Sequence, residues 1–264
     1  MFESLQKLLR YRGLIQTLVA RDLKARYRGS VLGFFWSFVN PLLLLSIYSF
    51  VFTYLLKNRA EGVQPYAVFM FTALLPWTWF QSSINEATGS LISGGNLIKK
   101  VLFPAEVLPL VTIIANMVHF LFGLPILIAF MAYYQVTPDW IELPWFIAVV
   151  GVQFIFTAAL ALLLSALAVH FRDVKDLVAN LLTFWFFATP IIYWYNDPDF
   201  QKYKFYFDLN PFSHLAISYQ EILFFDGPFG HKWWLLALGA ASVVLFLGAY
   251  WVFDRLRDSF AEAV

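Results

Sequence analysis

The chain has 264 residues, of which 61% are hydrophobic and only 13% are charged, and its formal net charge is +1. Because a soluble domain carries about 25% charged residues, this composition indicates an integral membrane protein rather than a soluble enzyme. The small net charge gives no reason to expect a nucleic-acid partner, and the absence of cysteine excludes disulfides, thiolate catalysis and cysteine-ligated metals.

The N-terminal segment, residues 1–28, joins apolar positions at helical spacing to a dense basic cluster. This pattern predicts an amphipathic helix in the cytoplasmic interface, and no apolar stretch before Arg21 is long enough for a signal peptide. The cluster predicts a cytoplasmic N-terminus, because Lys and Arg beside a span tend to stay inside. It also predicts a collar at headgroup level, with topology anchoring alone as an equal alternative. The collar residues are Arg21, Lys24, Arg26 and Arg28.

The remainder, residues 29–264, is predicted to be one all-α membrane domain with six transmembrane helices. Each predicted span lies in a stretch with few charges that is long enough to cross a bilayer. Both termini would then be cytoplasmic, and Lys and Arg are concentrated in the segments that this arrangement places inside. The spans are predicted at about 31–56, 66–84, 107–134, 145–168, 177–195 and 233–253.

The segment between the fifth and sixth spans contains an uncharged run at Leu209–Gln220. Its 12 residues are too few to cross a bilayer, so we expect a re-entrant or interfacial segment on the outer side. Asn210-Pro211 is a suitable helix start.

Polar residues inside the spans indicate surfaces that face protein or a water-filled path instead of lipid. Gly33, Ser37, Asn40 and Tyr48 share one face of the first span. His119 lies well inside the third span, and we interpret it as a hydrogen-bonded packing residue.

The chain contains 10 Trp, 13 Tyr and 30 Phe, which is 20% aromatic content. Much of this content suits lipid-facing surfaces and interfacial belts. A fraction would suit a glycan path, because the apolar face of a sugar ring packs on an aromatic ring without a fixed hydrogen bond. The candidate channel-lining residues are Phe35, Trp36, Tyr48, Phe52, Trp185, Phe187, Tyr193 and Trp194.

No catalytic or metal site is predicted. Gly89 to Gly94 has the glycine spacing of a phosphate-binding loop, but the Lys-Ser/Thr pair that would reach phosphate and magnesium is missing. Asp197-Pro198-Asp199 has the spacing of a metal-holding pair in some sugar-nucleotide enzymes, and we interpret it as a solvated turn.

Three stretches resemble the ABC-2-type permeases that export polysaccharides such as lipid-linked O-antigen, teichoic acid and capsule glycans. They are RDLKARYRGSVLGFFWSFVNPL at 21–42, NLIKKVLFPAEVLPL at 96–110 and NPFSHLAISYQEIL at 210–223. The resemblance extends over nearly the whole chain. It implies a homodimer in the bacterial cytoplasmic membrane, joined to two copies of a separate ATPase subunit that binds ATP and Mg²⁺, so this chain itself would be neither an enzyme nor a cofactor-binding protein.

The resemblance also implies which segments meet the ATPase and the glycan. Docking is expected at 85–103 and 170–176, and the channel is expected between spans 1 and 5 of each protomer. A basic residue is expected near the end of the outer segment, where this chain has Gln220-Glu221. The candidate docking residues are Glu86, Asn96, Lys99, Lys100, Arg172, Asp173 and Lys175. For a lipid-linked substrate, the basic collar would also attract the pyrophosphate, with topology anchoring alone as the equal alternative.

Two other functions compete with polysaccharide export. One is export of a small amphiphile or drug by the same fold. The other is an integral membrane sugar transferase, for which Asp197, Asp199 and Asp208 would have to supply the acidic groups.

Overall fold

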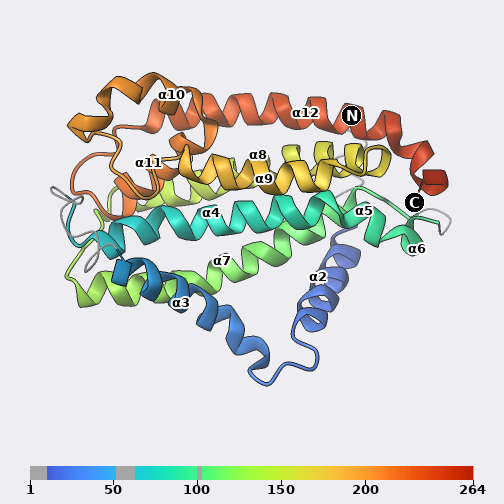
Figure 1. Cartoon of the computed structure of the whole chain (residues 1–264), viewed down its shortest axis with the longest axis horizontal. Coiled ribbons are helices and arrows are strands. Elements are labelled where there is room, and N and C mark those ends of the chain that lie inside the picture. Colours follow the sequence, from blue (N-terminus) through green and yellow to red (C-terminus); the bar gives the residue numbers. More distant parts are fainter. Residues whose placement is uncertain (1–10, 52–62, 100–102, 264) are drawn as a thin grey trace.

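Figure 1 shows the computed structural model, in which long helices lie side by side along the longest axis of the molecule. The structure describes residues 11–51, 63–99 and 103–263, and within these ranges every regular element is helical. This agrees with the predicted all-α class. In chain order the elements are α2 (Arg12–Arg26), the 3₁₀ turn η1 (Gly33–Phe35), α3 (Trp36–Phe50), α4 (Tyr66–Thr88), α5 (Ser90–Ser93), α6 (Gly95–Ile98), α7 (Val107–Tyr133), α8 (Leu143–His170), α9 (Val174–Phe187), η3 (Pro198–Tyr203), α10 (Lys204–Leu209), α11 (Pro211–Leu223) and α12 (Lys232–Ala263).

Three of the described helices, α7, α8 and α12, are long and apolar enough to cross a membrane. They coincide closely with the spans predicted at 107–134, 145–168 and 233–253. On α12 the exposed indoles of Trp233 and Trp251 are separated by about 27 Å of helix, close to the roughly 30 Å hydrocarbon thickness of a bilayer. Their positions suit the two interfacial belts.

The central helix of the bundle is α4, which packs against α3, α7, α8, α9 and α11. Its 23 residues are buried along most of their length and include more polar side chains than α7 or α8. Gly123 on α7 lies so close to the side chain of Leu75 on α4 that a Cβ there would overlap it. The absence of a side chain at Gly123 therefore sets the close approach of α4 and α7.

Two predicted spans differ from the helices that form. The segment predicted at 177–195 is helical only from Val174 to Phe187, so the predicted end at 195 is wrong. Pro190 lacks an N–H and disfavours helical geometry in the residue before it, which ends the helix early. Of the segment predicted at 31–56, η1 and α3 cover 33–50, and the residues from 52 onward lie outside the described ranges. The count of six spans therefore stays a prediction.

The helix predicted to begin at Asn210-Pro211 is α11. The side chain of Asn210 caps it by accepting a hydrogen bond from the backbone N–H of Phe212. Where a basic residue was expected, the amide of Gln220 donates to the carbonyl of Pro190, and Glu221 accepts from the backbone N–H of His231. These two residues hold α11 against its neighbours; whether the segment re-enters the membrane stays a prediction.

The two ends of the molecule differ in content (Figure 1). At one end, α5 and the start of α7 form an apolar cluster with the end of α8 and the end of α12. Leu18 and Val19 of α2 pack on the first turns of α7 at this end, and His170, the last residue of α8, contacts Ser259 on α12. The end carrying α2 therefore also carries the turn between α8 and α9, while α10 and α11 lie at the opposite end.

Candidate functional site

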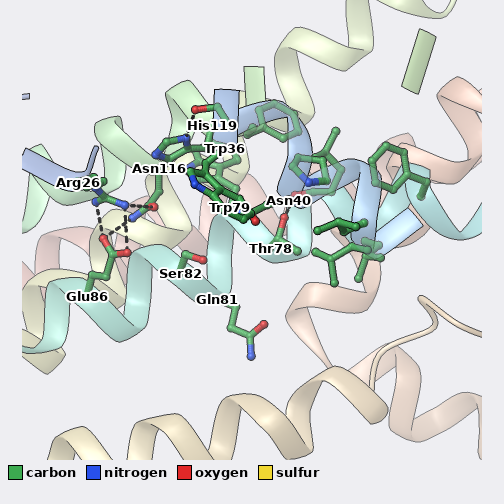
Figure 2. Close-up of a pocket in the computed structure, with 18 of the residues that line it drawn as sticks. Arg26, Trp36, Asn40, Thr78, Trp79, Gln81, Ser82, Glu86, Asn116 and His119 are labelled. Atoms are coloured by element: carbon green, nitrogen blue, oxygen red, sulfur yellow. Dashed lines mark hydrogen bonds and ion pairs between the residues drawn. The ribbon is translucent and has the colours of Figure 1, made fainter. Parts of the chain in front are cut away.

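A cavity of about 650 Å³ lies between α2, α3, α4 and α7. Figure 2 shows its labelled residues, with charged groups at one side and indole rings and small polar groups farther along. The wall from α3 contains Trp36, Ser37 and Asn40, whereas α4 contributes Thr78 and Ser82.

The charged side of the cavity is a closed network around Arg26 (Figure 2). Its guanidinium donates to both carboxylate oxygens of Glu86, at 3.1 and 2.5 Å, and to Asp22 at 2.8 Å. Asn116 accepts from Arg26 at 3.0 Å and donates to Glu86 at 2.9 Å. Burial alone would lower the pKa of Arg26, but the two carboxylates outweigh burial and raise it. The network thus ties α2 to both α4 and α7.

His119 lies next to this network and links α7 to α2 and α3. The hydroxyl of Tyr27 is 3.1 Å from His119 Nδ1 and 2.6 Å from the hydroxyl of Ser37. His119 lines the cavity, so its interpretation as a packing residue was incomplete: it is hydrogen-bonded, but at a cavity wall.

The predicted polar face of the first span is only partly a cavity wall. Ser37 and Asn40 line the cavity, which agrees with the predicted face turned away from lipid. Tyr48 packs against the hydrophobic core, and Gly33 begins η1. Sequence reasoning missed Thr78 and Ser82 of α4. These two residues and Glu86 are spaced four residues apart, and this spacing predicts that all three lie on one face of a helix.

The indole rings of the cavity are held by their own hydrogen bonds. Trp36 donates to the hydroxyl of Ser30 at 3.0 Å. Trp79 is buried, donates to the carbonyl of Ile113 and stacks on Phe120 at 5.2 Å between ring centroids. Trp36 is partly exposed and Trp79 is not, so Trp36 is the ring available to a bound molecule.

The predicted channel aromatics do not meet on one surface. Trp36 lines the cavity, whereas Trp185, Phe187 and Tyr193 line an apolar groove of about 870 Å³ between α8, α9 and α10. The remaining predicted aromatics lie elsewhere: Phe35 is exposed, Tyr48 is partly buried against the core, Trp194 is near Phe225, and Phe52 is outside the described residues.

The predicted collar separates into two kinds of residue. Arg26 is turned into the cavity and neutralised there, while Arg21, Lys24 and Arg28 are exposed. Arg21 also lines a second groove, of about 430 Å³, together with Asn96 of α6.

The predicted docking residues are similarly divided. Arg172 and Asp173 are exposed at the turn between α8 and α9, and Lys175 is exposed in the first turn of α9. Lys99 follows α6. Glu86 instead faces Arg26 in the cavity, and Lys100 lies outside the described residues. Contact of any of these residues with an ATPase stays a prediction.

At the opposite end, His214 of α11 and His231 before α12 form a second polar cluster. Their ring nitrogens are 2.9 Å apart, and the ring of His214 stacks on Trp234 at 4.6 Å. Burial, helped by the neighbouring His214, lowers the pKa of His231 to about 4. Burial also lowers the pKa of His214 and raises that of Glu221.

Acidic residues of the outer segment have structural partners. The carboxylate of Asp197 accepts from the backbone N–H of Asp199, which confirms the predicted turn. Asp208 accepts from the hydroxyl of Tyr195 at 2.5 Å. Among the described residues, no three His, Asp or Glu side chains are placed to hold a metal ion.

Comparison with known proteins adds an independent finding. The family described as ABC-2 type transporter matches residues 13–224. The chain is 39% identical over 265 residues to the O-antigen export system permease protein RfbA of Myxococcus xanthus, covering 100% of both chains. It is 32% identical to an O-antigen export system permease protein RfbA of Klebsiella pneumoniae over 94% of each chain. It is 23% identical to the capsule polysaccharide export inner-membrane protein CtrC of Neisseria meningitidis over 95% of each chain.

Proposed function

Because the chain belongs to the ABC-2 type transporter family, we propose that it is the membrane subunit of an exporter that moves a lipid-linked polysaccharide across the bacterial cytoplasmic membrane. The observation that carries the proposal is the 39% identity to an O-antigen export permease over the full length of both chains. A match of this extent covers the cavity and the outer segment together with the apolar helices.

The exporter requires an energy source, and the proposal assigns ATP and Mg²⁺ to a separate ATPase subunit present in two copies. Its docking surface is the end of the bundle that carries α2, α6 and the turn between α8 and α9. The exposed charges of Arg172, Asp173 and Lys175 support this assignment, because a short charged turn between two packed helices transmits displacement directly to both.

The proposed homodimer uses the apolar face of α9. Leu177, Leu181, Phe184 and Phe187 lie at helical spacing on that face and are 58–73% exposed in one protomer. A second copy facing this stripe would place α9 of both subunits beside the glycan path. Cross-linking of single cysteines at Leu181 tests the arrangement, since the native chain contains no cysteine.

The proposed topology places both termini in the cytoplasm. α2 and the last turns of α12 lie at the same end of the bundle as the α8–α9 turn, and this end carries the exposed Arg21, Lys24 and Arg28. Concentration of basic residues at one end suits the cytoplasmic side of a membrane.

Co-purification with the candidate ATPase, followed by ATPase assays with and without the lipid-linked glycan, tests the proposal. We expect a stable complex and turnover that rises with substrate. Transport by the chain alone at full rate without nucleotide, or the lack of any ATPase partner, would rule the proposal out.

A charge-reversal variant tests the docking surface. Arg172→Glu combined with Lys175→Glu is expected to weaken ATPase binding and to stop export. The matched control, Lys202→Glu with Lys204→Glu, reverses two charges at the opposite end and should leave the complex intact. Full coupling in the first variant would show that docking occurs elsewhere.

A further inference from the structure

The cavity between α3, α4 and α7 has a surface suited to a particular chemical class of ligand. Its volume of about 650 Å³ lies in the range of ligand-binding pockets, roughly 300–1,000 Å³. The nature of its polar and aromatic groups then decides what it can hold.

The formal charges of the cavity cancel. Among its described lining residues only Arg26 and Glu86 are charged, and they hydrogen-bond to each other twice. Asp22 adds a further carboxylate against Arg26. A phosphate or carboxylate ligand would have to displace these carboxylates from the guanidinium, so the cavity favours an uncharged ligand. The attraction of a pyrophosphate that we expected of Arg26 does not suit this arrangement.

Uncharged polar groups remain available farther along the cavity. Neither the amide of Asn40 nor the hydroxyl of Ser82 hydrogen-bonds to another described residue. Thr78 donates to the carbonyl of Leu75, which leaves its oxygen free to accept. Polar groups at the depth of the spanning helices are stable only when water or a ligand satisfies them.

An aromatic platform borders these groups. Trp36 precedes Asn40 by one helical turn on α3, and its hydrogen bond to Ser30 fixes the orientation of the indole. Trp79 and Phe120, stacked on each other, also line the cavity. A flat apolar ring beside amide and hydroxyl groups matches a sugar unit, whose ring face is apolar and whose edge carries hydroxyls.

We infer that this cavity binds one uncharged saccharide unit of the transported glycan, with Trp36 under the ring face and Asn40 and Ser82 hydrogen-bonded to its hydroxyls. The inference rests on the proposed export function and adds to it a site within a single protomer, formed by α3 and α4 instead of by α3 and α9. Arg26, Glu86 and Asn116 form the boundary of the site toward α2.

Binding is tested on the permease–ATPase complex in lipid nanodiscs. The probe is the neutral tetrasaccharide fraction cut from the cell's own surface polysaccharide, and saturation-transfer NMR measures its dissociation constant. We expect Asn40→Ala and Ser82→Ala each to weaken binding by about two- to tenfold, as the loss of one neutral hydrogen bond predicts. Trp36→Ala should weaken binding more than Trp36→Phe, which keeps an aromatic face.

The controls separate this site from general effects and from the proposed function. Gln201→Ala removes an amide from η3, which does not line the cavity, and should leave binding unchanged. If Asn40→Ala does not fold, the smaller change Ser82→Ala carries the test. Unaltered binding in the Asn40, Ser82 and Trp36 variants, a preference for an anionic oligosaccharide, or a phospholipid headgroup in the cavity would overturn the inference. If export continues despite any of these results, the inference fails but the proposed function stands. If the wild-type complex neither exports the glycan nor changes its ATPase turnover when the glycan is added, the proposed function itself is refuted.

Discussion

Arg26 on α2 and Glu86 on α4 are 60 positions apart in the sequence, yet the guanidinium donates to both oxygens of the carboxylate. Bidentate pairs of this kind fix orientation as well as distance. Asn116 bonds to both members, so a displacement of α2 is felt by α4 and α7 at the same time. Two contacts therefore hold α2 on the bundle: this ion pair and the apolar contact between α2 and the first turns of α7.

Replacing Glu86 should loosen α2 from the bundle. Glu86→Gln leaves the half-buried Arg26 with Asp22 as its remaining carboxylate, and we expect a loss of about 1–2 kcal/mol, since both partners are partly exposed. Asp22→Asn is the control, because it removes only an i,i+4 pair on one helix worth about 0.3–0.5 kcal/mol. Thermal unfolding in one detergent measures both variants.

The exchanged variant, Arg26→Glu combined with Glu86→Arg, tests whether the ion pair itself stabilises the contact between α2 and α4. It should recover part of the lost stability, because the attraction survives although the bonds to Asp22 and Asn116 change. Equal stability of Glu86→Gln and wild type would show that the apolar contact alone holds α2.

A second prediction concerns the contact of α4 with α7. Gly123→Ala places a methyl group against the buried side chain of Leu75 and should destabilise the fold by about 1–3 kcal/mol, as overpacking does. Gly151→Ala on α8 meets no atom within 4 Å and should be neutral or gain up to about 1 kcal/mol from helix propensity. A difference in apparent Tm between the two variants checks the prediction, and matching values would contradict it.

The apolar helices could be predicted from the sequence and most of the cavity could not, for a physical reason. α7, α8 and α12 follow from composition and charge spacing, which act locally along the chain. The polar spacing of Ser37 and Asn40 likewise predicted a face turned away from lipid. The partners of Arg26 lie 60 and 90 positions away, and no local pattern specifies such pairs. Asn210, whose amide bonds to the end of α9, is similarly 22 positions from Ala188.

A third prediction follows from the two outer histidines. Because the pKa of His231 is lowered from 6.5 to about 4, the unfolded chain binds a proton between these values that the folded chain does not. The contribution of His231 to stability should therefore be nearly constant above about pH 7.5 and fall by about 2 kcal/mol from pH 7.5 to pH 5. Asp208 and Lys204 face the pair with opposite charges, and the raised pKa of Glu221 offsets part of the loss.

His231→Gln isolates this contribution to the pH dependence. Glutamine does not titrate and keeps the backbone N–H that Glu221 accepts, so the slope of stability against pH should decrease. Gln201→Ala, which removes no titratable group, is the control and should retain the wild-type slope. An unchanged slope in His231→Gln would assign the acid sensitivity to other groups. Unfolding at several pH values between 5 and 7.5 provides the measurement.

The last prediction concerns Asn210, which joins the end of α9 to the start of α11. Its carbonyl oxygen accepts from the indole N–H of Trp185 at 2.7 Å and from the backbone N–H of Phe212. Its amide donates to the carbonyl of Ala188 and the hydroxyl of Thr189, each at 3.0 Å. One side chain thus satisfies the end of one helix, the start of another and the indole between them.

Asn210→Ala should cost about 2–4 kcal/mol, because it removes a helix cap and leaves the part-buried indole N–H of Trp185 without its acceptor. Asn210→Ser retains a capping oxygen but is too short to reach Trp185, so its cost should be about 1–2 kcal/mol smaller. Combining each change with Trp185→Phe, which has no N–H to satisfy, should reduce the difference between Ala and Ser. If the difference persists in the Trp185→Phe background, the indole contributes nothing to the anchor and the cap accounts for the whole effect.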